Sequence, residues 1–477
     1  MKDKLYEILA TLHYNSERRE PLESILANFL VSKDPRLDIE MEARRLFNKK
    51  DKQMQQIHRK YQQKDYLNSE QFIADWFKQE SLLLSNVSRN YLPEYIMEKF
   101  APYEDEFRRK NGFDFGSLWL FSFKFMEYFA FKQIQTGFAD EVYAFKSKKE
   151  YADLGFVKIP SPVYIEQWKN VITVNKSELR RLLFGSISSS DLDKVVDILS
   201  LNADRIPSNS KDIHFPSTPF LQTKEDLILP TPSYLGRSLH TIYESLFRKC
   251  QSYLDSKGTT FEKIALDLFR QTPTKLLAFK VKYGKNNQFE ADAIVSYERS
   301  LWVVEASSHI LSKGAFQGDL FHVRKDLNRT LRKCFTQGIR ALSNISTVSL
   351  PSPYNNLNKK GIIIVVDGVY PNLNLESFGD PTHNNMPVYV INYFDLRTLI
   401  DQPEIDQVEE FLLWRTQKPM PVICFDEKDY WNFYFDRYKR LNDIRATFKQ
   451  LQEKGVLLIY DGYRFNRKGY LARIRRE

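Results

Sequence analysis

The sequence predicts a mixed α/β core at residues 236–400, between a large helical domain at residues 1–150 and a helical extension with a basic tail at residues 401–477. Two observations carry this prediction. Gly112 is the first glycine of the chain, and the residues before it place apolar side chains at helical spacing. Later in the chain, three strand-like segments, a long helix and two apolar strands follow one another, which is typical of a sheet covered by helices.

Residues 151–235 predict a connecting region of short helices and proline-rich loops. Prolines beside serine and threonine punctuate it, for example at 160–162 and 230–232. Apolar spacing predicts short helices at 176–184 and 190–199 between these loops.

The core elements follow from periodicity and turn chemistry. Helical spacing covers 239–256 and 260–269, and Gly284 with the next three residues offers a turn between two strands. Residues 361–366 are continuously apolar, which is typical of a strand covered on both faces. The predicted strands are 276–283, 289–296, 301–306, 361–366 and 388–392, with a long helix at 319–342 after the third.

Composition bounds the kind of protein. Lysine and arginine number 70 against 61 acidic residues, a net charge of +9, which favours a polyanionic partner such as nucleic acid. The three cysteines are far apart, which fits a reducing compartment better than a disulfide framework. The most apolar segment, 117–134, carries three charged residues, so it predicts a buried helix rather than a membrane span. We therefore expect a cytoplasmic protein that has no membrane partner.

Two acidic residues occupy adjacent predicted strands. Asp292 lies in the middle of one strand, and Glu305 follows four apolar residues in the next. Buried carboxylates are costly, and two brought together by a hairpin repel each other. A bound divalent cation would resolve both problems and could activate a water molecule. Side-chain alternation places Ser307 on the same face as Glu305.

This pattern resembles the PD-(D/E)XK nuclease superfamily, in which an acid on one strand is followed by Glu-x-Lys on the next. The resemblance implies a restriction-endonuclease-like core and a Mg²⁺- or Mn²⁺-dependent endonuclease acting on nucleic acid, DNA above all, in bacterial DNA processing or defence. It implies a further metal ligand at Glu262, on the helix before the first strand, and a catalytic glutamine at Gln337. The segment 337–340 also resembles the end of the basic helix in a group of bacterial nuclease-related proteins.

The resemblance assigns a set of site residues. The metal ligands are Glu262, Asp292 and Glu305, and the catalytic set is Asp292, Glu305, Ser307 and Gln337. The cations of the long helix suit contacts with a phosphate backbone, and a solvated surface helix would carry the same residues. These cations are Arg324, Lys325, Arg329, Arg332, Lys333 and Arg340.

Ser307 departs from the family pattern, because it stands where the lysine is expected. Three readings stay open. The site cuts with another base or cation in place of the lysine, for which Lys282, Lys313 and Lys325 are candidates. It binds metal or nucleic acid without cutting, or the core is a scaffold that assembles with partner proteins or with a second copy. Motifs of ATPases, dinucleotide-binding proteins, metalloproteases and serine hydrolases are missing from the sequence.

Overall fold

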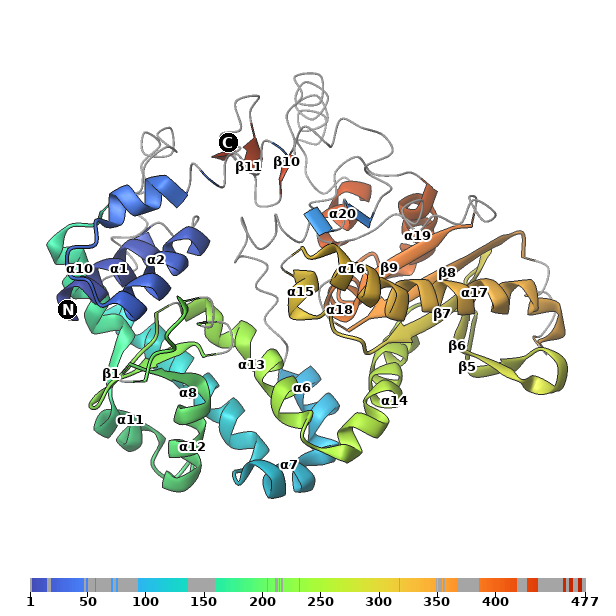
Figure 1. The fold of residues 1–477 in the computed structure, drawn as a ribbon. Coiled ribbons are helices and arrows are strands. Elements are labelled where there is room, and N and C mark those ends of the chain that lie inside the picture. The colour runs from blue at the N-terminus through green and yellow to red at the C-terminus, as the bar shows by residue number, and fades with distance from the viewer. Residues whose placement is uncertain are drawn as a thin grey trace. The chain divides into compact units, whose positions relative to one another are not determined.

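A computed structural model gives the fold (Figure 1). It describes residues 2–14, 19–46, 93–135, 159–203, 232–316, 318–348, 357–367, 386–417 and 427–435, together with shorter stretches between and after them. Within these residues, no helix combines the length and the apolar character that crossing a bilayer requires.

The chain divides into two compact units, which differ from the four segments expected from the sequence. The first comprises residues 1–53 and 80–255, and the second comprises 54–79 and 256–477. The supposed connecting region is therefore part of the first unit. Residues 54–79, expected in the helical domain, belong with the α/β core instead.

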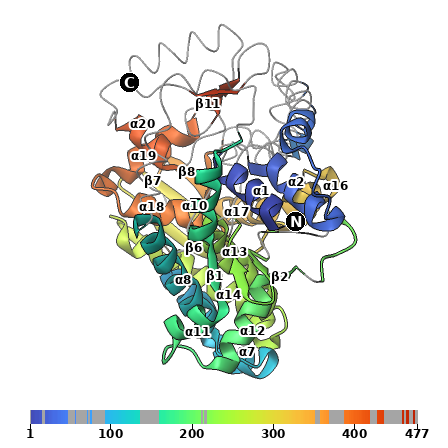
Figure 2. The same cartoon turned by 90° about the vertical axis from the view of Figure 1, so that its left-hand side faces the viewer.

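The first unit is largely helical, as expected, and also contains a small sheet (Figure 2). The strands lie in the order β1-β4-β3-β2, with β2 and β3 parallel and the other pairs antiparallel. Two short helices confirm the sequence prediction closely, α11 (Lys176–Leu183) and α12 (Ser189–Leu199). The remaining elements are α1 (Lys2–Tyr14), α2 (Arg19–Ser32), α6 (Pro93–Phe100), α7 (Glu104–Asn111), α8 (Phe115–Gln135), α10 (Pro162–Ile172), α13 (Pro232–Phe247), β1 (Thr173–Asn175), β2 (Ser200–Asn202), β3 (Phe220–Gln222) and β4 (Asp226–Ile228).

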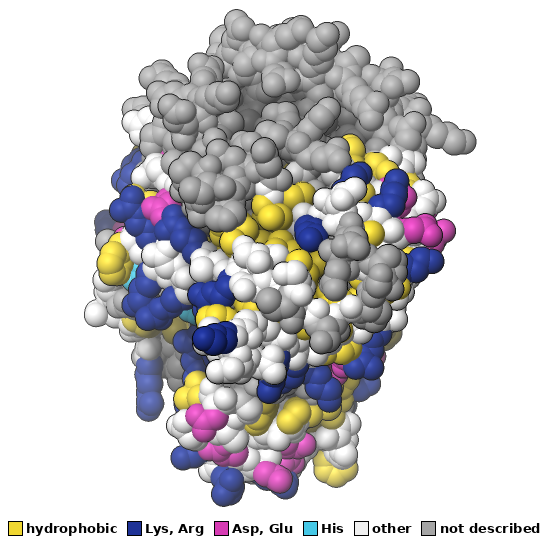
Figure 3. Space-filling view, turned by 90° about the vertical axis from the view of Figure 1, so that its right-hand side faces the viewer, with side chains coloured by type: hydrophobic (Ala, Val, Ile, Leu, Met, Phe, Trp, Pro, Cys, Tyr) yellow, Lys and Arg dark blue, Asp and Glu magenta, His cyan; other side chains and the backbone are white. Residues whose placement is uncertain are grey.

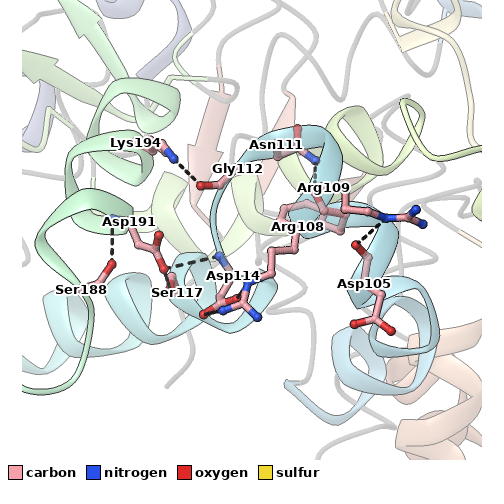
Figure 4. A network of polar contacts seen from close by, with 11 residues as sticks. Asp105, Arg108, Arg109, Asn111, Gly112, Asp114, Ser117, Ser188, Asp191 and Lys194 are labelled. Carbon is pink, nitrogen blue, oxygen red and sulfur yellow. Dashed lines mark hydrogen bonds and ion pairs between the residues drawn. The ribbon is translucent and has the colours of Figure 1, made fainter.

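Polar contacts fix α12 against the turn between α7 and α8 (Figure 4). Ser188 caps α12 by accepting a hydrogen bond from the Asp191 backbone N–H at 3.1 Å. The Asp191 carboxylate accepts one from the Ser117 hydroxyl at 3.1 Å, and Lys194 donates to the carbonyl of Gly112. Gly112 ends α7 with a φ of 75°, a left-handed conformation that glycine adopts without strain. Asp191 and Lys194 thus hold α12 against this turn.

The helix boundary near residue 250 was predicted wrongly. The sequence suggested helices at 239–256 and 260–269, but α13 ends at Phe247 and α14 runs without a break over Gln251–Asp267. The reason is a cap distant in sequence, because Glu106 of α7 accepts hydrogen bonds from the backbone N–H groups of Gln251 and Ser252 at 2.9 and 3.0 Å. That carboxylate satisfies the first N–H groups of α14.

The second unit contains a five-stranded mixed sheet in the order β5-β6-β7-β8-β9. The strands are β5 (Leu276–Tyr283), β6 (Phe289–Ser296), β7 (Ser300–Ser307), β8 (Lys359–Val366) and β9 (Val388–Asn392). β5, β6 and β7 pair antiparallel, whereas β7, β8 and β9 pair parallel. The predicted mixed α/β core and all five strand positions are confirmed.

Helices cover both faces of this sheet. On one face, Ile294, Val303 and Ile362 form a continuous core with residues of α16 (Leu320–Leu327) and α17 (Lys333–Ser343). On the other, Tyr389 packs against Phe411 of α19 (Val408–Gln417), and its hydroxyl donates to Glu427 of α20 (Glu427–Tyr434) at 2.8 Å. The start of the supposed C-terminal extension therefore completes the α/β core.

The predicted extension at 401–477 also contains α20, and residues 436–457 lie outside the described residues. Further on, β10 (Leu458–Ile459) and β11 (Tyr463–Phe465) form an antiparallel hairpin, to which β12 (Leu471–Arg473) adds beside β11. Helix α18 (Tyr393–Ile400) follows β9 directly.

Gly338 sets how closely α17 approaches β8. A Cβ atom at this position would lie 2.8 Å from the Ile362 side chain, which belongs to the buried core. We expect Gly338→Ala to lower the free energy of unfolding by about 1–3 kcal/mol through overpacking. Urea denaturation measures this change.

Gly116 of α8 provides the control, since a Cβ there meets nothing within 4 Å. Gly116→Ala should be neutral or slightly stabilising. Adding Ile362→Val should recover part of the loss in the Gly338→Ala protein. Equal stability of the two alanine variants would disprove the close approach.

Candidate metal-binding site

The strands β6 and β7 part where the two acids lie. Regular pairing runs from Ser296 opposite Leu301 to Ala293 opposite Val304. Beyond it, the Ala306 backbone N–H donates to the Asp292 carboxylate at 2.7 Å. The side chain of Asp292 thus takes the acceptor role of a strand carbonyl, which fixes its carboxylate beside β7.

Glu305 is buried and lacks a full set of partners. Its side chain is 1% exposed, and its Oε1 has no hydrogen-bond partner in the described part of the chain. Burial is the main cause that raises its pKa to about 9, and the charges of Asp292 and Glu262 add to it. An orphaned oxygen on a buried carboxylate is costly unless a cation or a proton compensates it.

Glu262 reaches the same place from α14. Burial first, and then the charge of Asp292, raise the pKa of Glu262, whereas the charge of Lys280 lowers it. The Lys280 Nζ lies 3.8 Å from Glu262 Oε1. The structure therefore brings all three predicted acids into one electrostatic neighbourhood, as the sequence suggested.

These residues fit a divalent cation held by two carboxylates. The ligand oxygens of Glu262, Asp292 and Glu305 do not all lie within 4.8 Å of one another. Mg²⁺ does not need them to, because it often binds one or two carboxylates and keeps waters or substrate phosphates as its other ligands. The unpartnered Oε1 of Glu305, on the strand next to Asp292, is the donor that such an ion would use.

The sequence did not identify Lys280 as a residue of this site. Its backbone is strained. It has a φ of 51° inside β5, and the ladder skips its pairing with Asp292. A residue other than glycine costs of order 1–3 kcal/mol in a sparsely populated backbone region. Such strain persists where the surroundings impose it, often at functional sites. No sequence pattern signals a positive φ at a lysine.

Lys333 is the second cation that acts on this site. It begins α17 directly after a π-helical turn, η6 (Asn328–Arg332). Its charge lowers the pKa of Asp292 and of Glu305, opposing burial. Gln337 lies one turn further along α17, and its backbone carbonyl accepts a hydrogen bond from the Tyr283 hydroxyl at 3.4 Å. Lys333 and Gln337 thus share one side of the helix.

Ser307 ends β7 and is half-buried. Its hydroxyl accepts a long hydrogen bond from the His309 backbone N–H at 3.5 Å. Ser307 stands where the nuclease motif has a lysine, and three lysines were candidates to replace it. Of these, Lys282 and Lys325 are exposed, and neither is among the charges that act on Glu262, Asp292 and Glu305. The side chain of Lys313 lies outside the described residues. Lys280 and Lys333 are the better candidates.

The basic helix has two of its arginines already paired. Arg324 and Arg332 both donate to the carboxylate of Glu70. Partial burial raises the pKa of Glu70, but these hydrogen bonds outweigh it and hold that pKa below its ordinary value. The Arg340 guanidinium lies 4.5 Å from the centre of the Phe289 ring. Lysine and arginine side chains gather on the face shown in Figure 3.

Comparison with known proteins adds no assignment: no family model, curated protein or solved structure matches the chain.

Glu305 makes stability depend on pH in the metal-free protein. Its pKa is raised from 4.5 to about 9, so protonation of this carboxyl favours the folded state. Its contribution to the free energy of unfolding is complete below pH 4.5 and is lost as the pH rises through 9. We expect this contribution to fall by up to about 1.4 kcal/mol per pH unit within that window. Urea denaturation in a chelator, compared with Glu305→Gln, measures it.

The Glu305→Gln protein should show a flatter stability profile and be the more stable one at alkaline pH. Glu298→Gln, which removes an exposed acid from the turn between β6 and β7, should keep the native slope. Parallel profiles for native protein and Glu305→Gln would contradict a buried, uncompensated carboxylate.

Proposed function

We propose that this chain is a metal-dependent nuclease that hydrolyses phosphodiester bonds of nucleic acid, DNA above all, through a restriction-endonuclease-like core. The observation that carries the proposal is Glu305, a buried carboxylate with an unpartnered oxygen beside a second carboxylate on the adjacent strand. Perturbed carboxylates gathered in this way are typical of sites that bind a cation or do acid–base chemistry.

The order of elements supports the same proposal. Glu262 is on the helix before the first strand, Asp292 is on the second strand, and Glu305 is on the third. Gln337 is on the helix between the third and fourth strands. These are the positions that the resemblance to PD-(D/E)XK nucleases assigns to an acid, the motif pair and a glutamine.

In this mechanism Asp292 and Glu305 hold Mg²⁺ or Mn²⁺. When bound, the ion lowers the pKa of a water molecule and neutralises charge that develops on the phosphodiester. The Ala306 N–H orients the Asp292 carboxylate, which leaves its other oxygen for the ion. Glu262, whose pKa is raised, would accept a proton from the attacking water.

Lys280 supplies the positive charge that Ser307 does not. Its ammonium group lies beside Glu262, and its charge also acts on Asp292. In this position it can hold the scissile phosphate and stabilise the charge that grows on its oxygens. The strained backbone of Lys280 is then the cost of aiming this side chain at the acids.

Cleavage tests the site directly. With Mg²⁺ or Mn²⁺, we expect the purified chain to cut single- or double-stranded DNA, measured on labelled strands by gel electrophoresis with RNA alongside. Glu305→Ala and Asp292→Ala should lower the rate at least about 100-fold, because each removes an ion ligand. Glu298→Ala, which removes an exposed acid from the turn between β6 and β7, should cut normally. Full activity in Glu305→Ala would place the chemistry elsewhere.

Lys280 and its neighbour Lys282 form a matched pair, since both are exposed lysines on β5. Lys280→Ala should lower kcat by about 100- to 1,000-fold, the usual cost of one lost electrostatic contact in a transition state. Lys282→Ala should leave kcat unchanged.

Lys280→Gly separates charge from strain, because glycine accepts a φ of 51°. This variant should be as inactive as Lys280→Ala but more stable. Lys280→Arg should keep part of the activity. Equal rates for Lys280→Ala and Lys282→Ala would remove Lys280 from the mechanism.

Ser307 favours a second candidate function, a nuclease-like module that binds nucleic acid or a partner protein without cutting it. The hydroxyl of Ser307 accepts a hydrogen bond from the backbone N–H of His309 in the neighbouring loop, and it carries no charge. If the native chain binds DNA without cutting and Ser307→Lys gains cleavage, the silent module is the better description. Cleavage by the native chain excludes it.

A further inference from the structure

The basic helix holds one acidic side chain between two of its arginines. Glu70 comes from a part of the chain far away in sequence, and it belongs to the same compact unit as the sheet. Close by in the chain, Ala74 is fully buried in the core formed with α16 and α17. Glu70 is thereby anchored next to the cations that the sequence assigned to nucleic-acid binding.

Each oxygen of the Glu70 carboxylate meets a different guanidinium. Arg332 Nη2 lies 2.5 Å from Oε1, and Arg324 Nε donates to Oε2. Asn328 accepts a hydrogen bond from the other terminal nitrogen of Arg332 at 2.5 Å, which orients that guanidinium. The Glu70 side chain is 17% exposed, against 58% for Arg324 and 34% for Arg332. The arginines can be reached from solvent, and the carboxylate lies between them.

The π turn aligns the two arginines. Residues eight apart on a regular α-helix are offset by about 80° around its axis. The π-helical turn Asn328–Arg332 holds more residues per turn, which reduces that offset. Such turns occur frequently at functional sites. Arg324 and Arg332 can therefore bind one small anion from the same side of the helix.

We infer that Arg324 and Arg332 form a binding site for a backbone phosphate of nucleic acid, and that Glu70 occupies this site in the free protein. A carboxylate and a phosphate both present two oxygens to guanidinium groups, so one can replace the other. The identity of the ligand rests on the proposed function, whereas the site itself rests on the contacts.

The surroundings favour nucleic acid over a free phosphate ion. Lys325 and Arg329 are exposed on the same helical stretch and extend its positive charge. Phe321, one turn before Arg324, is 70% exposed and offers an aromatic face on which a base can stack. A nucleic acid must displace Glu70 to use the arginines, so the closed state lowers its apparent affinity.

Fluorescence anisotropy with labelled single-stranded and duplex DNA tests this inference. A chelator prevents cleavage, so the assay reports binding alone. Glu70→Gln should bind about three- to ten-fold more tightly than the native chain, because it breaks both ion pairs and frees the two arginines. Glu410→Gln is the control, since it removes the same charge from an exposed pair with Arg299, at 2.5 Å, in the same unit.

The gain should require both arginines. Adding Arg324→Ala and Arg332→Ala to Glu70→Gln should abolish it and reduce the salt dependence of binding by about one phosphate contact for each arginine. Glu70→Asp, which keeps the charge on a shorter side chain, guards against a folding defect and should show an intermediate gain.

Three outcomes overturn the inference. If Glu70→Gln binds DNA with the same affinity as the native chain, the occupied phosphate site is refuted, and the nuclease proposal is unaffected. An equal gain in Glu410→Gln reduces the effect to net charge. If none of these proteins binds DNA, while the native chain cleaves it and Glu305→Ala does not, then the substrate contacts lie away from this helix.

Discussion

The arrangement depends on the burial of Glu305 beside Asp292, at the point where β6 and β7 cease to pair. A carboxylate that is 1% exposed and has an unpartnered oxygen is destabilising by itself. Positive charge reaches the acids from two directions: Lys333 on α17 acts on Glu305 and Asp292, and Lys280 on β5 acts on Asp292 and Glu262. A proton, or a divalent cation, can satisfy the remaining deficit of this carboxylate.

The rest of the α/β unit holds these strands in place. Gly338 lets α17 lie close to β8, and Gly361 leaves room for the Trp302 ring, which a Cβ would meet at 2.4 Å. On the opposite face, the buried pair of Arg415 and Glu427, 3.0 Å apart, ties α19 to α20. A site built on rigid strands keeps its carboxylates in position, and its ligand does not have to order them.

Local sequence signals predicted the core well and the tertiary contacts poorly. Strands β5, β6 and β9 match the predicted bounds because their alternation and turn chemistry are local. The break before α14 escaped prediction because its cap, Glu106, lies 145 residues earlier. Asp292 and Glu305 followed from their places in adjacent strands. Lys280 did not, because its positive φ comes from the packing around it.

Binding of Mn²⁺, followed by electron paramagnetic resonance, tests the central claim most directly because it needs neither substrate nor turnover. The account expects the native chain to bind Mn²⁺ at neutral pH, with Mg²⁺ competing. It expects Glu305→Gln to lose this site and Glu298→Gln, which removes an exposed acid, to keep it. Unchanged Mn²⁺ binding in Glu305→Gln, or no Mn²⁺ bound by the native chain, would contradict a metal site at these carboxylates.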